Sequence, residues 1–398
     1  MVDPVVISAA SCVTATGIGM ANIYASLVDG KTGLAKNDFT NDPLDCFIGR
    51  VANVEDVILS PAQSHFLCRN NQLAKLSLQA DGFDDQVADA VSKFGASRVA
   101  VVVGTTTAGI TVAENAFSYM NENGLSQLEG YDFSGTQSHA SLAEFVKEYL
   151  NLEGLAYVIS TACSSSAKVF ADAKQLLDAG LADAVVIGGV DSLCMLTLYG
   201  FNSLELVAPE ICRPCDANRK GLSIGEAGGF ALLMRATDQT PGDVCLYGYG
   251  ESSDAYHISA PHPDGQGARG AMQSALTMAG LVPGDLSYVN MHGTGSQKND
   301  AAEDLAISTV FGNDLPVSST KGWTGHTLGA AGIVEAVISM LSIKNNFMPR
   351  TLNMQNRDRT LSCNILDQSK HENVQYVLSN SFGFGGNNCC LILGKRSK

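Results

Sequence analysis

Residues 158–177, VISTACSSSAKVFADAKQLL, place a short apolar run before a group of small and hydroxyl residues and then a helical pattern. The order predicts a strand, a tight turn and a helix. Cys163 lies in the turn. A free cysteine usually behaves as a small buried hydrophobic residue. A helix N-terminus also favours a thiolate, because its amides and dipole stabilise an anion. Two interpretations of Cys163 therefore stay open at this point: a buried thiol and a nucleophile.

The same alternation of strand and helix recurs along the chain. Several of the apolar runs are apolar throughout, which is typical of strands covered on both faces and predicts a layered α/β fold. The predicted strands are PVVISAA (4–10), RVAVVVGTTT (98–107), AVVIGGVDS (184–192), GGFALLMRA (228–236), DVCLYGYGESS (243–253), SYVNMHGTG (287–295), LPVSST (315–320), VQYVLSNSFGFGG (374–386) and NCCLILGK (388–395).

The two parts of the chain look related. TACSSSAKVFADAKQLLDAG (161–180) and STKGWTGHTLGAAGIVEAVISMLSI (319–343) both open a long helix after a polar turn. Each part also ends in an apolar strand, FALLMRA and CCLILGK. The segment RATDQTPGDV (235–244) is the expected seam. We therefore predict a duplicated α/β unit with halves at 1–243 and 244–398.

The composition limits the class of protein. The 398 residues include 45% apolar and 16% charged residues and carry a net charge of −15. This balance argues against a general affinity for nucleic acid or anionic membrane. The N-terminus lacks the pattern of a secretory signal, and acidic residues interrupt the apolar stretches, so we expect no membrane span.

The eleven cysteines are an odd number in a long chain, which favours reduced thiols and a cytoplasmic protein. CRPC (Cys212, Cys215) has the spacing of metal ligands, but without a second such pair we predict no zinc site there. Cys389 and Cys390 lie in an apolar run and are interpreted as strand packing.

Three further turns hold candidates for chemistry. His292 lies in NMHGTGSQKNDAAE (290–303), and His326 in the turn that opens the helix of the second half. A neutral imidazole can accept a proton or donate a hydrogen bond, so two histidines could hold an oxyanion beside a sulfur. Structural histidines are the alternative. Lys321 and Glu335 could form an ion pair that tunes them, or be ordinary structural charges.

The glycine-rich stretch NSFGFGGNN (380–388) predicts unusual backbone angles or a close approach to a ligand. Its backbone amides could form an oxyanion hole.

Taken together, TACSSSA, HGTGSQKNDAAE, STKGWTGHTLGAAG and NSFGFGGNN resemble the motifs of the β-ketoacyl-[acyl carrier protein] synthases, of the KAS I/II type, in the thiolase superfamily. The resemblance covers nearly the whole chain. It implies five layers, α-β-α-β-α, built from two pseudo-symmetric halves. It also implies a cytoplasmic dimer that needs no metal or organic cofactor. Its substrates are bound covalently to the phosphopantetheine arm of acyl carrier protein.

The resemblance assigns a role to each motif. Cys163 accepts the acyl group, and malonyl decarboxylation then drives carbon–carbon bond formation with His292 and His326 holding the enolate oxygen. Lys321 and Glu335 support the histidines.

The resemblance also places the remaining site residues. The amides of Cys163 and Phe384 form the oxyanion hole, and Phe384 is a gate flanked by Gly383, Gly385 and Gly386. Thr294 and Ser296 bind the pantetheine arm. Thr106 and Thr107, in GTTTAGI (104–110), could line the acyl pocket, or be ordinary hydroxyls at a strand end.

The chain departs from the family pattern in several places. Cys215 and Leu222 replace aromatic residues, and Lys168 stands where fatty-acid enzymes often have histidine. The chain has few basic residues that could bind an acidic carrier protein, and Arg69 and Lys75 are the candidates. These departures favour a specialised type II pathway, such as polyene, aryl-polyene or polyketide synthesis, over housekeeping fatty acid synthesis.

Other functions remain open from the sequence. A chain-length factor, which shapes a partner's tunnel without acylation, typically lacks the cysteine that this chain retains. A thiolase would need a second catalytic cysteine, and NSFGFGGNNCC lacks the expected Cys-x-Gly. The sequence also leaves open whether the dimer is formed with a second copy or with a related ketosynthase or chain-length subunit.

Overall fold

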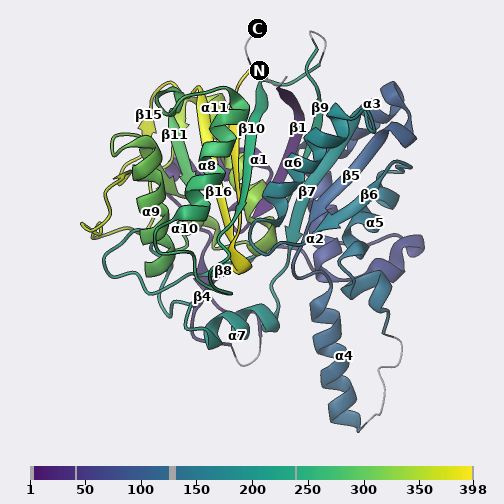
Figure 1. Cartoon of the computed structure of the whole chain (residues 1–398). Helices are drawn as coiled ribbons and strands as arrows, with labels where there is room; N and C mark the ends of the chain where they lie inside the picture. Colours follow the sequence, from purple (N-terminus) through teal and green to yellow (C-terminus); the bar gives the residue numbers. More distant parts are fainter. Residues whose placement is uncertain (1–3, 41–42, 125–130, 238–239, 397–398) are drawn as a thin grey trace.

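The computed structural model describes residues 4–40, 43–124, 131–237 and 240–396. Two positions of the predicted seam, 238 and 239, lie outside these residues, and the boundary at 243/244 stays a prediction. The chain forms α-helices and one large mixed sheet, as the apolar runs predict (Figure 1).

Two groups of strands in this sheet repeat one order. In each group of five strands, the first two pairs of neighbouring strands are parallel and the last two pairs are antiparallel. The first group is, in spatial order, β6 (Ala156–Ile159), β5 (Val99–Gly104), β7 (Ala184–Asp191), β9 (Ala227–Arg235) and β1 (Val5–Thr14). The second is β12 (Pro316–Ser319), β11 (Tyr288–Met291), β16 (Tyr376–Gly383), β17 (Asn387–Lys395) and β10 (Val244–Ser253). The predicted duplication is therefore present in the topology.

The two groups join where β1 and β10 pair antiparallel, with Val5 opposite Leu246. Short strands complete the sheets: β2 (Gly17–Ile18) beside β1, β14 (Asn364–Ile365) beside β12, a small sheet of β3 (Ala35–Lys36), β4 (Phe47–Gly49) and β8 (Ile224–Gly225), and the pair β13 (Phe347–Met348) and β15 (Lys370–His371).

Helices form three layers around the two groups. The middle layer holds α6 (Ser165–Asp178) and α11 (Ala331–Asn345), which contact each other and strands of both groups. The outer layers are α2 (Arg69–Gln79), α3 (Phe83–Phe94) and α5 (Ala140–Tyr149) on the first group, and α8 (Gln266–Ala279) and α9 (Gln297–Phe311) on the second. The expected order α-β-α-β-α is confirmed.

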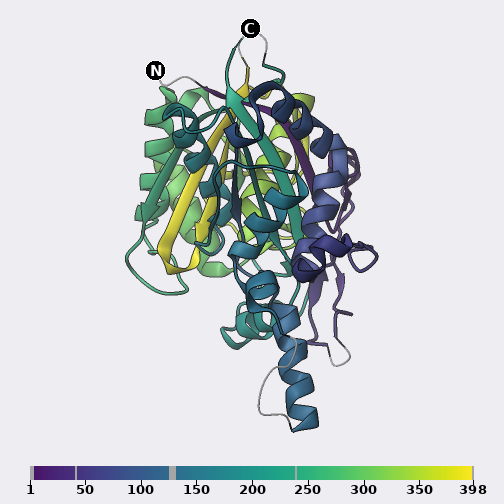
Figure 2. The ribbon, with the colours of Figure 1, turned by 90° about the vertical axis from the view of Figure 1, so that its right-hand side faces the viewer.

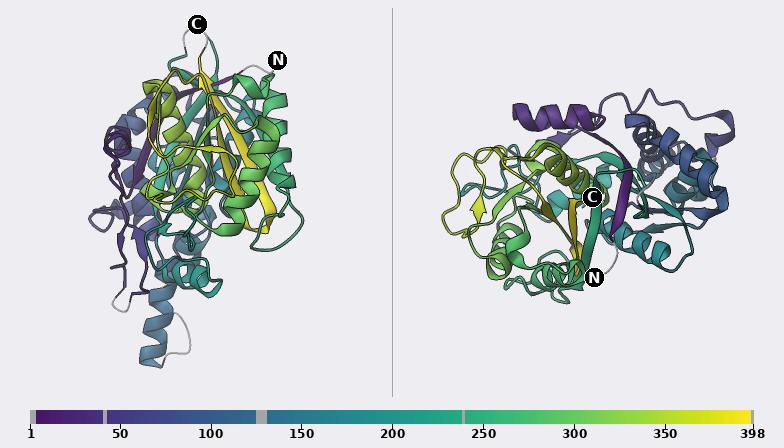
Figure 3. Two further views of the ribbon diagram at one scale, coloured as in Figure 1. Left: turned by 90° about the vertical axis from the view of Figure 1, so that its left-hand side faces the viewer. Right: turned by 90° about the horizontal axis from the view of Figure 1, so that it is seen from above.

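In the described part of the chain, four further helices complete the fold: α1 (Met20–Asp29), α4 (Ile110–Asn123), α7 (Met195–Ser203) and the short α10 (Lys321–Thr324). Helix α1 packs on β1 and α11, and all four residues of α10 are buried. Figures 2 and 3 show α4 projecting from one end of the molecule, while β1 begins and β17 ends at the opposite end.

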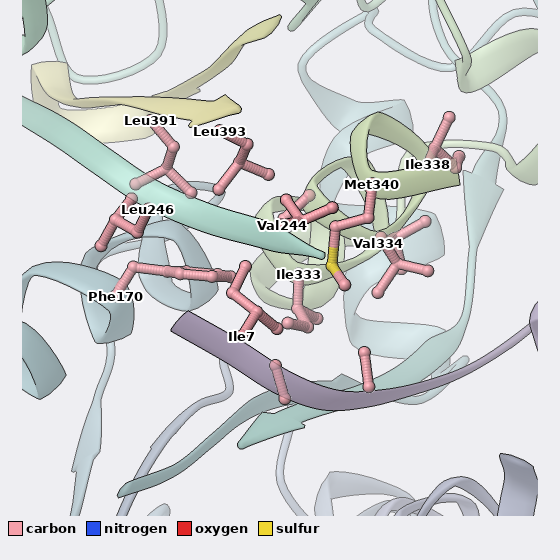
Figure 4. Close-up of a cluster of buried hydrophobic side chains, with 14 of the residues drawn as sticks. Ile7, Phe170, Val244, Leu246, Ile333, Val334, Ile338, Met340, Leu391 and Leu393 are labelled. Atoms are coloured by element: carbon pink, nitrogen blue, oxygen red, sulfur yellow. The ribbon is translucent and has the colours of Figure 1, made fainter. Parts of the chain in front are cut away.

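The core is formed where the middle helices meet both sheets. Figure 4 shows Ile7 of β1, Phe170 of α6, Leu246 of β10, Ile333 of α11 and Leu391 of β17 converging in one buried cluster. Burial of this apolar area from five elements is the main favourable contribution to the fold.

Helix α11 is apolar on all sides because it is covered on all sides. Residues Leu328–Asn345 are long and apolar enough to cross a membrane, with mean hydropathy 1.3, yet 89% of this window is buried inside the protein. It is therefore interpreted as a core helix between two sheets.

Gly332 lets the two middle helices approach closely. A Cβ atom added at Gly332 would lie 2.3 Å from the backbone nitrogen of Ala167, so even one methyl group requires the helices to move apart. The amide of Ile333, one residue further, donates to Ser166 Oγ (3.0 Å) and fixes the crossing point.

We expect Gly332→Ala to lower the free energy of unfolding by about 1–3 kcal/mol, because overpacking at a backbone contact cannot relax through a side-chain rotamer. Chemical denaturation measures it. Gly284→Ala is the matched control, since nothing lies within 4 Å of a Cβ added there. Equal stabilities of the two variants would contradict the close contact between α6 and α11.

Candidate active site

Three turns bring Cys163, His292 and His326 into one cavity of about 540 Å³. Cys163 precedes α6, His292 follows β11, and His326 follows α10. A sulfur or ring nitrogen of each residue lies within 4.8 Å of the other two. The layered fold places loops after parallel strands at the same edge, which explains how residues so far apart in sequence meet.

Cys163 lies on a strained turn. Ala162 has φ 54°, a left-handed backbone angle that costs a residue with a side chain roughly 1–2 kcal/mol. The Thr161 amide donates to Ser165 Oγ (2.9 Å) and closes the turn. The turn directs Cys163 to the cavity at the start of α6, as a nucleophile would require.

Burial dominates the ionisation of this thiol. Desolvation raises the pKa of Cys163 to about 12, although the Lys321 ammonium and the Phe384 amide, which donates a hydrogen bond to the sulfur, both lower it. The helix N-terminus favours the anion, and burial opposes it: the raised pKa favours the protonated thiol.

Both histidines are neutral donors. Burial and the Lys321 charge hold the pKa values of His292 and His326 well below the usual range. Nδ1 of His326 accepts from the Leu328 amide (3.2 Å), and Nδ1 of His292 faces Lys321 Nζ (3.3 Å). With both Nδ1 atoms engaged as acceptors, each neutral ring keeps its proton on Nε2. The rings lie nearly perpendicular, with centroids 5.2 Å apart.

Lys321 links the two histidine turns. Its ammonium donates to Glu335 Oε1 and to the His292 carbonyl, and all three residues are buried. Burial raises the pKa of Glu335, and the Lys321 charge opposes that rise. A buried pair of this kind stabilises little by itself, but breaking it leaves an uncompensated charge. The contact is consistent with a role in orienting His292.

Glu303 is a site residue that the sequence analysis missed. Its two carboxylate oxygens accept from the His292 and Gly293 amides, each at 2.8 Å, and Asn380 Nδ2 donates to it (3.0 Å). Burial raises the pKa of Glu303 to about 7. The motif HGTGSQKNDAAE contains this glutamate, but only the fold shows that its carboxylate binds the backbone amides of the His292 turn.

The backbone of His326 is held by a different element. Its amide donates to the Ser223 carbonyl (2.8 Å), and its carbonyl accepts from the Gly225 amide (3.0 Å), so β8 fixes this turn. The site is thus assembled from both halves of the chain.

The glycine-rich turn lies beside Cys163. Phe384 lines the cavity, its ring stacked on Phe201 with centroids 5.3 Å apart. Gly385 has φ 77°, which a residue with a side chain adopts only under strain, and its amide donates to the Ile258 carbonyl (2.8 Å). Gly383 and Gly386 also line the cavity.

Thr294 and Ser296 line the same cavity. Thr294 Oγ1 donates to Ser296 Oγ (3.1 Å), which in turn accepts from the Asn299 amide (3.3 Å) at the start of α9. Ser296 therefore caps a helix, and a role in binding the pantetheine arm would come in addition.

Thr106 and Thr107 are not among the residues that line this cavity, and their place in an acyl pocket stays a prediction. Their hydroxyls and amides instead donate to the buried carboxylate of Asp191, with the amides at 2.7 and 2.9 Å. A buried carboxylate needs several donors, and Asp191 also accepts from the Gly329 amide (2.6 Å). The threonines therefore tie the end of β5 to the end of β7, and Asp191 also holds the turn before α11.

The residues that depart from the family pattern lie in different parts of the structure. Leu222 lines the cavity, whereas Cys215 is buried in the core beside α8 and α9. Lys168 pairs with Glu251 (3.1 Å). Cys212 is buried and donates to the Thr294 carbonyl (3.5 Å), so the CRPC segment supports the Thr294 turn.

The basic residues at the cavity differ from those expected. Arg69 is engaged with Glu226 and Glu55 (both 2.6 Å), and Lys75 Nζ donates to the Ile58 carbonyl (2.7 Å). Lys220 and Lys298 are exposed and line the cavity itself. Lys220 also pairs with Glu210 (3.0 Å).

The three central residues have the types of a metal site, a thiol and two imidazoles. The Lys321 charge beside His292 and the raised pKa of Cys163 both oppose a bound cation. The arrangement instead suits a sulfur nucleophile next to two hydrogen-bond donors.

We expect alkylation of Cys163 by iodoacetamide to accelerate about tenfold per pH unit from pH 7 to 9, because only the thiolate reacts and its pKa lies above this range. Peptide mass mapping assigns the modified cysteine, and Cys163→Ser is the control. A plateau below pH 8 would contradict the raised pKa.

The comparisons with known proteins agree on one family. Residues 2–239 match the beta-ketoacyl synthase N-terminal domain and residues 244–355 its C-terminal domain. The 3-oxoacyl-[acyl-carrier-protein] synthase 2 of Synechocystis is 30% identical over 98% of both chains. The enzyme of that name from Rhizobium meliloti is 39% identical, over 61% of this chain and 61% of its own length.

Solved structures show the same relationship. The structure titled ketosynthase ApeO in complex with its chain length factor ApeC, from Xenorhabdus doucetiae, contains a chain 36% identical to this one. That chain superposes with a TM-score of 0.90 and coverage of 99% and 98%. The chain described here belongs to the beta-ketoacyl synthase family and has its thiolase-like fold.

Proposed function

We propose that this chain catalyses a decarboxylative Claisen condensation between an acyl group on Cys163 and malonyl on an acyl carrier protein. The product is a 3-ketoacyl thioester. The convergence of one thiol and two neutral imidazole donors in a single cavity supports this proposal most directly.

The first half-reaction is acyl transfer. Cys163 Sγ attacks the carbonyl carbon of the incoming thioester, and the amides of Cys163 and Phe384 hold the resulting oxyanion. The carbon–sulfur bond to the carrier then breaks, and the proton of Cys163 ends on the departing carrier thiol. This step splits the condensation into two easier ones.

The second half-reaction uses the histidines. The bond between the malonyl carboxylate and its methylene carbon breaks, carbon dioxide leaves, and the electron pair forms an enolate whose oxygen faces His292 and His326. The enolate carbon attacks the acyl carbonyl on Cys163. The bond to Sγ breaks, and the sulfur takes up one proton. Neutral donors suit this work, because an imidazolium would protonate the carbanion.

Incubation of the purified protein with an acyl-carrier thioester, followed by intact-mass analysis, tests the proposal. We expect one acyl adduct on Cys163, discharged by malonyl-carrier as a 3-ketoacyl product. His292→Ala and His326→Ala should still acylate but lose decarboxylation by a factor of about 100 or more, the usual effect of removing an oxyanion donor. Cys163→Ala is the control for adduct position.

The absence of an adduct across a panel of primers, with a partner subunit present, would overturn the condensing function and favour a chain-length-factor role. An adduct that both histidine variants discharge at the wild-type rate would overturn the assignment of the histidines.

We further propose that the chain works as a heterodimer with a related chain-length subunit in a specialised polyene-type pathway, rather than in housekeeping fatty acid synthesis. The similarity to a ketosynthase crystallised with its chain length factor supports this proposal. Among the described residues, β6 ends the sheet order and pairs only with β5, which leaves an open edge. The projecting helix α4 exposes two large aromatic side chains, Phe117 (50%) and Tyr119 (61%), and Phe133 (56%) is exposed in the segment 133–137, which contacts α4.

We expect Phe117→Asp with Tyr119→Asp to weaken association with the co-expressed partner by at least tenfold, since a charge at a buried contact costs more than 1.4 kcal/mol. Light scattering after gel filtration measures it. Leu305→Asp on α9, exposed by 45%, is the control. A stable homodimer that excludes the co-expressed partner would contradict the heterodimer.

A further inference from the structure

Helix α7 carries a wall of the active-site cavity and packs on the core through its middle and its end. Leu198 is the one residue of this described helix that is buried, while Met195, Leu196 and Tyr199 are exposed. Near its end, Phe201 is half-buried against the same apolar cluster as Leu198, lines the cavity and stacks on Phe384. The exposed start of the helix therefore needs support of another kind.

That support comes from Glu114 on the projecting helix α4. Glu114 Oε1 accepts from the Leu196 amide (2.7 Å), and Oε2 accepts from the Met195 amide (3.2 Å). These are the first two residues of α7, whose amides have no acceptor within the helix and whose helix dipole favours a negative charge. The sulfur of Cys194, the N-cap residue, contacts the Thr197 hydroxyl (3.2 Å). The capping carboxylate thus comes from a distant part of the chain.

A line of direct contacts then connects α4 to the nucleophile. Glu114 holds the start of α7, Phe201 near its end stacks on Phe384 at 5.3 Å, and the Phe384 amide donates to the sulfur of Cys163. Phe384 follows the last pair of the β16–β17 hairpin, Gly383 opposite Asn387, and the Gly385 amide donates to the Ile258 carbonyl (2.8 Å). These contacts hold the ends of the turn, and the stack with Phe201 is a side-chain contact that positions the Phe384 ring.

We propose that Glu114 is a positioning residue of the active site: by capping α7 it keeps Phe201 against Phe384 and so keeps the Phe384 amide on the sulfur of Cys163. The proposal deepens the proposed function, since it assumes that Cys163 is the acylated residue. It assigns no substrate contact to Glu114, which acts through α7.

Without the carboxylate, α7 retains Leu198 as its buried anchor and loses the acceptor for two amides. The ring of Phe201 then moves with the helix, and the 383–386 turn gains freedom. Two consequences follow: faster exchange of the amides in that turn, and slower acylation of Cys163, because a donor for the sulfur and for the oxyanion is less often in place.

Hydrogen exchange followed by mass spectrometry tests the proposal in the full chain without substrate. We expect Glu114→Ala to accelerate exchange of peptides covering 195–203 and 380–388 roughly tenfold, the factor that corresponds to loss of a capping carboxylate worth about 1.4 kcal/mol. Phe201→Leu should accelerate only the second peptide. The double variant should match Glu114→Ala in that peptide, because both changes interrupt the same contacts.

Glu122→Ala is the matched control, since Glu122 lies on the same helix and contacts Ser118 of that helix (3.2 Å). It should exchange like the wild type. Glu114→Gln retains a hydrogen-bond acceptor without the charge. Its exchange rates should lie between those of the wild type and Glu114→Ala, which separates positioning from a global loss of stability.

Unchanged exchange of 380–388 in Glu114→Ala would overturn the proposal, whether or not 195–203 loosens. Additive effects of Glu114→Ala and Phe201→Leu in 380–388 would overturn it as well. The outcome is independent of the proposed function, because exchange needs no acyl carrier. Acylation of the wild-type Cys163 tests that function separately, and the acylation rate of Glu114→Ala should fall in step with the exchange.

Discussion

The close contact between α6 and α11 determines the rest of the molecule. The backbones of the two helices are in contact at Gly332 and Ala167, between the two groups of strands, and both groups need a helical cover. Because each middle helix packs on strands of both groups, neither half can move without disturbing the core of the other. The contact also lies one turn from Cys163 at the start of α6, so the packing that stabilises the fold also fixes the position of the nucleophile.

The duplicated topology explains why the two halves contribute different parts of the site. Ala162 lies three residues before α6 and Leu328 three residues before α11, and both have a left-handed backbone, with φ 54° and 52°. The next residue is Cys163 in one half and Gly329 in the other. The equivalent of the nucleophile is thus a glycine, whose amide binds the buried Asp191 carboxylate. One half supplies the sulfur and the other both histidines, and the turns that hold Cys163 and His326 share this design.

The sequence predicted the elements of the fold better than their contacts. Every apolar run interpreted as a strand is a strand, because long stretches of β-branched residues need cover on both faces. The short turns and motifs also predicted that Cys163, His292 and His326 share a site, and the structure brings them into one cavity. What the sequence could not show are the acceptors that hold the turns: Glu303, Asp191 and Glu114 each bind backbone amides of another element. Such partners are visible only after folding. The hydroxyls of Thr106 and Thr107 likewise donate to Asp191, a contact that their sequence did not indicate.

Burial is the main cause of the pKa shifts of Cys163, His292 and His326. A low-dielectric cavity penalises every charge, so it keeps both imidazoles neutral and the Cys163 thiol protonated while the single Lys321 ammonium is balanced by Glu335. Each effect helps a condensation that proceeds through a carbanion. Neutral imidazoles donate hydrogen bonds to an enolate without protonating its carbon, and a thiol that ionises only at the moment of attack resists adventitious alkylation. The raised pKa of Cys163 is therefore compatible with its role as nucleophile: the structure lowers the cost of the charges that form during the reaction, at the Phe384 amide and the two imidazoles, rather than that of a charge present beforehand.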